Sequence, residues 1–137
     1  MKVAKRVPKW QSGLRHNITT VDELKEHIDI PEEQEEDLKR IVDRHPMSIP
    51  RHYMHLINPH DLDDPIRRMA VPSTFEADTS GMEDTSGEAC NTMMCGLQHK
   101  YKQTVLLLSS NICAMYCRHC FRKRMVGLTN DEIVSKL

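Results

Sequence analysis

Three cysteines near the end of the sequence have the spacing of a metal-cluster ligand set. Cys113, Cys117 and Cys120 follow a C-x3-C-x2-C pattern. Three thiolates this close in sequence can cap one face of an iron–sulfur cube, each binding one iron. The fourth iron then lacks a protein ligand, so it can hold a small molecule and pass an electron to it.

Two other interpretations of the cysteines stay open at this point. Zinc could be held by a C-x4-C…C-x2-C set made of Cys90, Cys95, Cys117 and Cys120, or the cysteines could be buried small apolar side chains. The chain has five cysteines. Its basic start, Met1–Arg6, is followed by no apolar stretch, so we expect no secretory signal and a cytoplasmic protein. Clustered cysteines in such a chain indicate metal or redox ligands before disulfides.

The elements around the cysteines should position them. Residues 104–109 (TVLLLS) form a continuous apolar run, which predicts a strand buried on both faces, as in a parallel sheet. Residues 129–132 (TNDE) have a capping signal that predicts a helix through Ile133, Val134 and Leu137. The cysteines would then lie at the carboxyl end of a parallel strand, where α/β proteins place their active sites.

Residues 1–72 are predicted to form a helical, heavily charged region. Residues 20–23 (TVDE) have capping-box spacing, and a longer helix is expected to begin near Pro31 and to end before Pro46. Two shorter helices should follow, the second capped by Asp64. The predicted apolar stripe of the longer helix consists of Leu38, Ile41, Val42 and His45.

Residues 73–96 have the composition of a polar linker between this helical region and the rest of the chain, residues 97–137. The segment repeats the sequence DTSG at residues 78–81 and 84–87. Small, polar and acidic residues bury too little surface to offset the entropy of ordering, so we interpret the segment as a surface loop.

Length and charge exclude several classes of protein. With 19 basic and 20 acidic residues the net charge is −1, which argues against a general nucleic-acid binder. The longest apolar run, residues 105–108, is too short to span a membrane. A complete (β/α)₈ barrel takes about 250 residues, so we expect this 137-residue chain to be the front part of a longer protein or to depend on a partner.

The cysteine motif and its flanks resemble a known family. Residues 111–124 (NICAMYCRHCFRKR) resemble the signature of the radical S-adenosylmethionine aminomutases, which act on amino acids. Residues 96–101 (GLQHKY) are similar to the family's G-L-T-H-R-Y, and residues 64–67 (DPIR) are similar to its D-P-I-R segment. The similar blocks run in the family's order from about Trp10 to Gly127.

The resemblance implies a fold, an activity and cofactors. The fold would be a mainly α N-terminal region followed by the first β-α unit of a partial TIM-type radical S-adenosylmethionine barrel, with the chain truncated. The activity would be that of an isomerase, an amino-acid 2,3-aminomutase. Its [4Fe–4S] cluster would cleave S-adenosylmethionine reductively and start radical migration of an amino group, and pyridoxal phosphate would support that migration.

The resemblance also implies residue roles. The three cysteines of the motif would be iron ligands. His119 would lie beside the adenine of S-adenosylmethionine, Arg122 would grip the substrate carboxylate with its planar guanidinium, and Tyr101 would lie near pyridoxal phosphate. Each of these residues has a competing interpretation. His119 could be an ordinary loop histidine, Arg122 one member of a solvated basic run, and Tyr101 a tyrosine packed on the barrel rim.

The sequence departs from the family at positions that bear on pyridoxal phosphate. Where the family has H-R-Y-P-D-R-V, residues 99–105 read HKYKQTV. Lys100 replaces one arginine and keeps a positive charge without the fork, while Thr104 replaces the other and keeps none. Pyridoxal phosphate binding is therefore less firmly implied than the cluster, and Phe121 in place of a threonine could alter the substrate pocket.

Other positions have no counterpart in the pattern. Cys90 and Cys95 match nothing in the family, and we interpret them as incidental loop thiols, with an extra metal site as the alternative. The lysine that holds pyridoxal phosphate and the acidic residues that select the substrate lie beyond residue 137 in the family. No catalytic residue is assigned here for that reason.

The expected partners follow from this interpretation. They are an amino-acid substrate, an electron donor for the cluster and, from the family's oligomers, a second copy of the chain. We expect neither a membrane nor a nucleic-acid partner. A nucleic-acid contact through Arg118, His119 and residues 122–124 ranks last because the chain offers no strong aromatic platform beside them.

Overall fold

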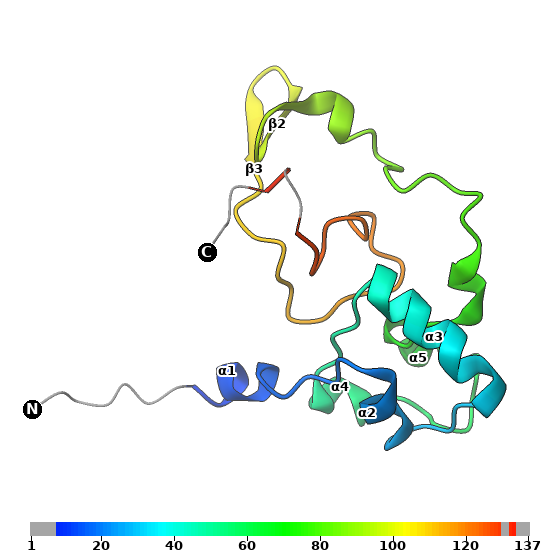
Figure 1. The fold of residues 1–137 in the computed structure, drawn as a ribbon. Helices are drawn as coiled ribbons and strands as arrows, with labels where there is room; N and C mark the ends of the chain where they lie inside the picture. The colour runs from blue at the N-terminus through cyan, green and yellow to red at the C-terminus, as the bar shows by residue number, and fades with distance from the viewer. Residues whose placement is uncertain (1–7, 130–131, 134–137) are drawn as a thin grey trace, which may run out of the picture.

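The computed structural model describes residues 8–129 and 132–133 (Figure 1). Five helices come first, of which the sequence predicts all but the first, and a small sheet follows after a long connection. The helices are α1 (Lys9–Leu14), α2 (Val21–Lys25), α3 (Glu32–Arg44), α4 (Arg51–Met54) and α5 (Pro65–Ala70). The connection holds the 3-10 turns Thr74–Ala77 and Ala89–Asn91, and the strands are β1 (Thr92–Met94), β2 (Leu97–Tyr101) and β3 (Thr104–Leu107).

Local chemistry explains where the helices begin. The Thr20 hydroxyl accepts a hydrogen bond from the Glu23 backbone N–H at 3.2 Å, and the Glu23 carboxylate accepts one from the Thr20 N–H at 3.3 Å. This reciprocal pair is the predicted capping box. The Asp64 carboxylate likewise caps α5 by accepting from the Ile66 N–H at 2.9 Å. Both predicted caps are confirmed.

Helix α3 matches the prediction from its apolar stripe. It begins one residue after Pro31, carries three acidic residues in its first turn, and ends at Arg44, before Pro46. Leu38 and Ile41 are buried on one face. None of the described helices has the length and apolar character needed to cross a membrane.

The main core lies among helices α2, α4 and α5 and the segments between them. An isolated antiparallel bridge joins Ile18 and Ile49 through N–H···O bonds of 2.8 and 2.9 Å. Helix α1 buries no residue and extends away from this core (Figure 1). The buried members of the core are Ile18, Leu24, Ile28, Met47, Ile49, Met54, Ile57, Ala70 and Val71.

The strand prediction is right in position and wrong in environment. Strand β3 pairs antiparallel with β2, which pairs antiparallel with β1, so the order is β1-β2-β3. The side chains of Val105, Leu106 and Leu107 are 56%, 43% and 60% exposed. Only two residues separate β2 from β3, and so short a connection can join antiparallel strands only. The described residues thus form an antiparallel hairpin sheet where a buried parallel strand was expected.

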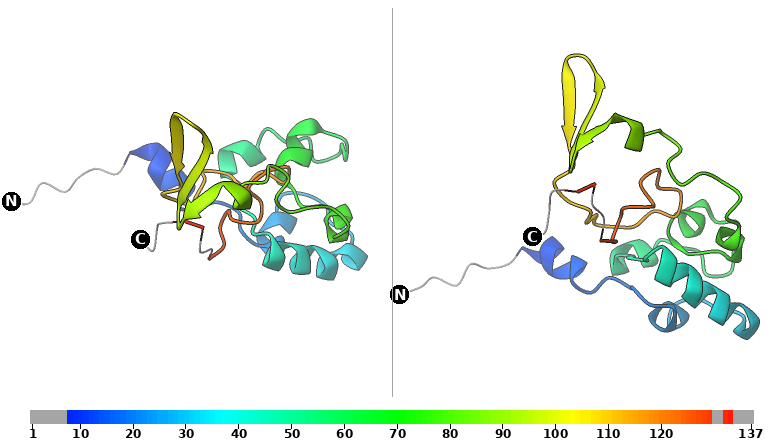
Figure 2. Two further views of the ribbon diagram at one scale, coloured as in Figure 1. Left: turned by 90° about the horizontal axis from the view of Figure 1, so that it is seen from above. Right: turned by 45° about the horizontal axis from the view of Figure 1, so that its top comes forward.

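Two other expectations meet different outcomes. The segment 73–96, expected to be a surface loop, contains two 3-10 turns and the strand β1, and Ser73 opens the first turn with a capping box to Glu76. The predicted helix after residue 129 lies outside the described residues, apart from Glu132 and Ile133. The right-hand view of Figure 2 shows the hairpin projecting away from the helices, with the connection running down one side of the molecule.

Candidate functional site

The cysteine loop follows β3 and lies against the helical region (Figure 1). Its backbone is attached at two points, since the Tyr116 N–H donates to the Ser48 carbonyl at 3.0 Å and the Arg118 N–H donates to the Met69 carbonyl at 2.8 Å. The Asn17 side-chain amide adds a bond to the Ala114 carbonyl at 2.9 Å. Helical residues far away in sequence therefore set the path of the loop.

The loop is also closed on itself. The Gly127 N–H donates to the Asn111 carbonyl at 3.0 Å, and the Asn111 side chain donates to the Leu128 carbonyl at 2.5 Å. Gly127 has a φ of 74°, and a Cβ there would lie 2.5 Å from Cε2 of Tyr116. Only glycine suits this position, because any side chain would clash with the tyrosine ring and strain the backbone.

The three motif cysteines lie on this one loop as free thiols. Cys113 is exposed, whereas Cys117 and Cys120 are half-buried. Burial raises the pKa of the Cys117 thiol, and the negative charges of Cys120 and Cys113 raise it further.

The thiols of the loop are the donor type that iron–sulfur clusters use. Within residues 8–129 and 132–133, no three His, Cys, Asp or Glu residues are placed to hold one metal ion. A cube does not require such convergence, because each thiolate binds a different iron. The zinc alternative is not supported. Cys90 is exposed, and the Cys95 thiol faces the Ile133 carbonyl at 3.5 Å.

Arg118, between the second and third motif cysteines, is buried in a charged cluster. Its side chain is 4% exposed, and it donates through Nη2 and Nε to the Glu76 carboxylate at 2.6 and 3.0 Å. Its Nη1 donates to the carbonyls of His45 and Pro46 at 3.0 and 3.1 Å. Lys123 also pairs with Glu76. Burial alone would raise the pKa of Glu76, but its bonds to Arg118 and Lys123 outweigh that effect and hold the pKa below its ordinary value.

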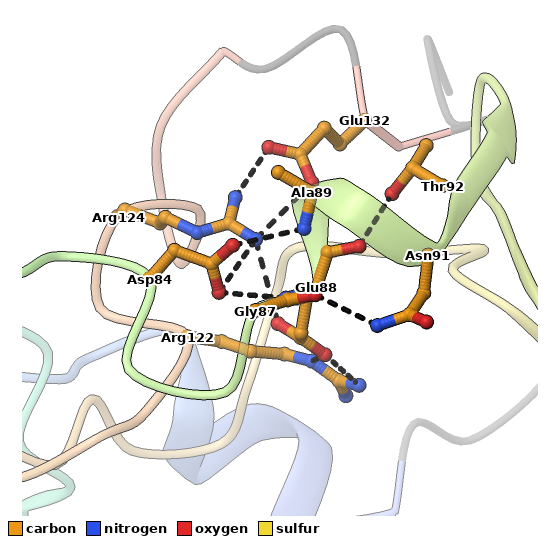
Figure 3. A network of polar contacts seen from close by, with 9 residues as sticks. All are labelled: Asp84, Gly87, Glu88, Ala89, Asn91, Thr92, Arg122, Arg124 and Glu132. Atoms are coloured by element: carbon orange, nitrogen blue, oxygen red, sulfur yellow. Dashed lines mark hydrogen bonds and ion pairs between the residues drawn. The ribbon is translucent and has the colours of Figure 1, made fainter. Parts of the chain in front are cut away.

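A second charged cluster lies beyond the third cysteine (Figure 3). The Arg122 guanidinium donates to one Glu88 oxygen through Nη2 and Nε at 2.7 and 3.0 Å. Arg124, with a side chain only 10% exposed, points among Glu88, Asp84 and Glu132 and pairs with all three. Backbone N–H groups of Ala89 and Glu88 hold the pKa of Asp84 below its ordinary value.

These clusters correct the interpretation of residues 118–124 as a solvated basic run. All four cations of the run are paired with carboxylates of the acidic segment or with Glu132, so they offer little free charge to a nucleic acid. The acidic partners were missed from sequence. The available signal was charge complementarity, since residues 73–88 hold five acids and no lysine or arginine.

The remaining candidate residues are spread over the molecule. His119 is exposed and lines a cavity of about 550 Å³ together with Arg67, Arg68 and Phe75. Tyr101 is 66% exposed at the end of β2, with the Lys100 ammonium 5.9 Å from its ring centroid. The tip of the hairpin that carries both points away from the cysteine loop (Figures 1 and 2). The structure thus gathers the cysteines and the basic run, and it places the hairpin residues elsewhere.

Comparison with known proteins gives a consistent relationship. No family model matches the chain. The chain is 38% identical over 126 residues to L-lysine 2,3-aminomutase of Clostridium subterminale, an alignment that covers 90% of this chain and 30% of that protein. It is 41% identical over 129 residues to L-lysine 2,3-aminomutase of Acetoanaerobium sticklandii, covering 93% of this chain and 31% of the relative. The predicted resemblance to amino-acid 2,3-aminomutases is confirmed, and these relatives are lysine 2,3-aminomutases.

A further relative has a different substrate in its name. Glutamate 2,3-aminomutase of Clostridioides difficile is 32% identical over 120 residues, or 87% of this chain and 28% of the relative. These relatives are aminomutases, so the relationship is to a family of isomerases. The chain spans about 30% of the length of the curated relatives it matches.

Proposed function

We propose that this chain is the cluster-binding portion of a radical S-adenosylmethionine amino-acid 2,3-aminomutase. Cys113, Cys117 and Cys120 would each ligate one iron of a [4Fe–4S] cluster and leave the fourth iron to S-adenosylmethionine. The chemistry that these groups supply when bound is reductive cleavage of S-adenosylmethionine and radical migration of an amino group. The partners would be an amino-acid substrate and an electron donor.

One observation carries the proposal. Three free thiols with C-x3-C-x2-C spacing lie on one closed loop, in a chain 38% and 41% identical to two lysine 2,3-aminomutases. Gly127 and Asn111 hold the two ends of the loop together. The exposure of Cys113 leaves that side of the loop open to a ligand.

The other assignments belong to the same proposal. Arg122 would bind the substrate carboxylate through its guanidinium, which lies 4.9 Å from the ring centroid of Phe121 and would exchange its present partner, the Glu88 carboxylate, for that of the substrate. His119 would contact the adenine group. Tyr101 and Lys100 would lie near pyridoxal phosphate, and the exposed hairpin that carries them would need to be covered by further protein for that role.

We propose further that β3 is the first strand of a barrel. It lies at one end of the sheet order, with β2 on one side only among the described strands. This strand exposes the apolar residues Val105, Leu106 and Leu107 to solvent, which is unfavourable. A parallel strand from the rest of a longer protein could pair with the free edge of β3 and cover these side chains.

Iron counting in cysteine variants tests the proposal. The chain is reconstituted with iron and sulfide without oxygen, and iron and the visible spectrum are measured for single Cys113→Ala, Cys117→Ala and Cys120→Ala variants. Cys90→Ala and Cys95→Ala are the matched controls. We expect the wild type and both controls to take up a brown four-iron cluster, and the three motif variants to lose most of it. A wild-type chain that binds zinc stoichiometrically and gives no iron chromophore would contradict the proposal, most clearly if Cys90→Ala abolished zinc binding.

A further inference from the structure

The acidic segment 73–88, whose composition is that of a linker, lies along the cysteine loop. A cavity of about 440 Å³ is lined from one side by Asp78 and Met82 and from the other by Cys120 and Lys123, so the two stretches are neighbours in space. They are more than 30 residues apart in sequence. What joins them is the set of ion pairs described above, and Glu76 binds the most deeply buried cation of the set, Arg118.

Glu76 holds the loop at two positions around the third cysteine. Its carboxylate bonds Arg118, which directly follows Cys117, and Lys123, whose backbone N–H donates to the Cys120 carbonyl at 3.1 Å. The side chain of Glu76 is 14% exposed. The Cys117 and Cys120 backbones are thereby fixed from both sides by a single carboxylate.

The Glu76 carboxylate is also held by a residue of its own segment. The Ser73 backbone N–H donates to Glu76 Oε1 at 3.0 Å within the capping box of the first 3-10 turn. The same guanidinium that Glu76 binds is anchored to the carbonyls of His45 and Pro46 at the end of α3. The chain of contacts therefore runs from the helical region through Arg118 and Glu76 to the cysteines.

Removing the Glu76 charge would have a specific consequence. Arg118 would be left as a buried cation without its counter-ion, an arrangement costly enough to force rearrangement. Turning the guanidinium toward solvent would break its bonds to the His45 and Pro46 carbonyls, which help to hold the backbone between Cys117 and Cys120 against the helical region. The thiols would then lose the arrangement in which they meet one cluster.

We propose that Glu76 is a positioning residue for the iron–sulfur cluster, acting through Arg118 and Lys123. This inference rests on the proposed function, because it presumes a cluster on Cys113, Cys117 and Cys120. It assigns to the acidic segment the task of shaping the cysteine loop for metal binding.

The test compares Glu76→Gln with Glu83→Gln in the reconstituted chain. Glu83 lies in the same segment but pairs with Arg44 on α3 at 2.7 Å instead of with a residue of the cysteine loop, so it receives the matched substitution. Outer partners of metal ligands typically change metal retention on the order of 10–100-fold. We expect Glu76→Gln to lose its cluster to a chelator roughly tenfold faster or more and to alter the electron paramagnetic resonance spectrum of the reduced cluster. Glu83→Gln should match the wild type, and Glu76→Asp should restore part of the retention.

A measurement without metal separates this inference from the proposed function. In the cluster-free chain, the half-buried Cys117 should react with a thiol reagent several-fold faster in Glu76→Gln than in Glu83→Gln. If the wild type forms no cluster but this difference in reactivity is seen, the proposed function fails, whereas the role of Glu76 in positioning the cysteine loop is supported. If Glu76→Gln keeps the wild-type rate of cluster loss, spectrum and Cys117 reactivity, the inference is overturned. Should Glu76→Gln lose its helical circular dichroism, Glu76→Asp, whose shorter side chain cannot reach Arg118 and Lys123 in the same way, is used instead. It should lose its cluster faster than Glu83→Gln, and an equal rate together with equal Cys117 reactivity would overturn the inference.

Discussion

Replacing Arg118 by methionine should destabilise the chain more than any exposed charge substitution. The Arg118 side chain is 4% exposed and donates to the Glu76 carboxylate and to the carbonyls of His45 and Pro46. Breaking a buried ion pair by removing one partner typically costs about 3–5 kcal/mol. Because Lys123 still pairs with Glu76, we expect the lower end, about 3 kcal/mol.

The assay is urea unfolding followed by far-ultraviolet circular dichroism. Trp10 would be a poor probe because it is 65% exposed on α1, which buries no residue. With a denaturant slope of about 1–3 kcal/mol/M, the midpoint should fall by roughly 1–3 M. Arg118→Lys keeps the charge but loses the fork, so it should fall between wild type and Arg118→Met.

The matched control is Arg40→Met on α3. Its side chain is 76% exposed and its pairing with Asp37 is 3.4 Å long, so the expected loss is near zero. A loss below about 1 kcal/mol for Arg118→Met, or a loss as large for Arg40→Met, would refute the reasoning from burial.

Three other predictions concern stability and use the same urea assay. Gly127→Ala should lower the free energy of unfolding by about 1–3 kcal/mol, because of the positive φ and the clash with the adjacent tyrosine ring. Gly13→Ala, with open space around it, should not lower it. Burial, followed by the nearby Lys123 and Arg44 charges, lowers the pKa of His45 from 6.5, and the pKa of Glu76 is lowered from 4.5. Because the unfolded chain binds these protons more readily than the folded chain, both groups stabilise the fold at a pH above their ordinary pKa values. The free energy of unfolding should therefore fall on acidification in two phases, below about pH 6.5 and below about pH 4.5. His45→Gln should remove the upper phase, and an unchanged upper phase would contradict this assignment. Thr20→Ala should cost about 1 kcal/mol through loss of the capping box, and no change in midpoint would show that α2 does not depend on its cap.

The parts of the fold that could be predicted from sequence are those fixed by neighbouring residues. The caps at Thr20 and Asp64 involve bonds over two to three residues, and the apolar stripe of α3 repeats within one helix. Such features depend on little beyond the local chain. Spacing likewise singled out the motif cysteines as candidate ligands, whereas the choice of a cluster over zinc depended on the flanking residues.

The features that could not be predicted depend on distant partners. An apolar run such as residues 104–107 predicts a strand but not the direction of its neighbour, and β2 escaped notice because its residues are largely polar. The short separation of the two segments was a hairpin signal that went unused. The pairing of Glu76 with Arg118 spans 42 residues, and composition does not say which acid meets which base.

The central claim is that three thiolates hold three irons and leave the fourth for S-adenosylmethionine. The most direct measurement is the electron paramagnetic resonance spectrum of the reduced, reconstituted chain with and without S-adenosylmethionine. The account predicts a [4Fe–4S] signal whose g-values shift when S-adenosylmethionine is added, with Cys90→Ala and Cys95→Ala behaving as the wild type. A signal that ignores S-adenosylmethionine would contradict it.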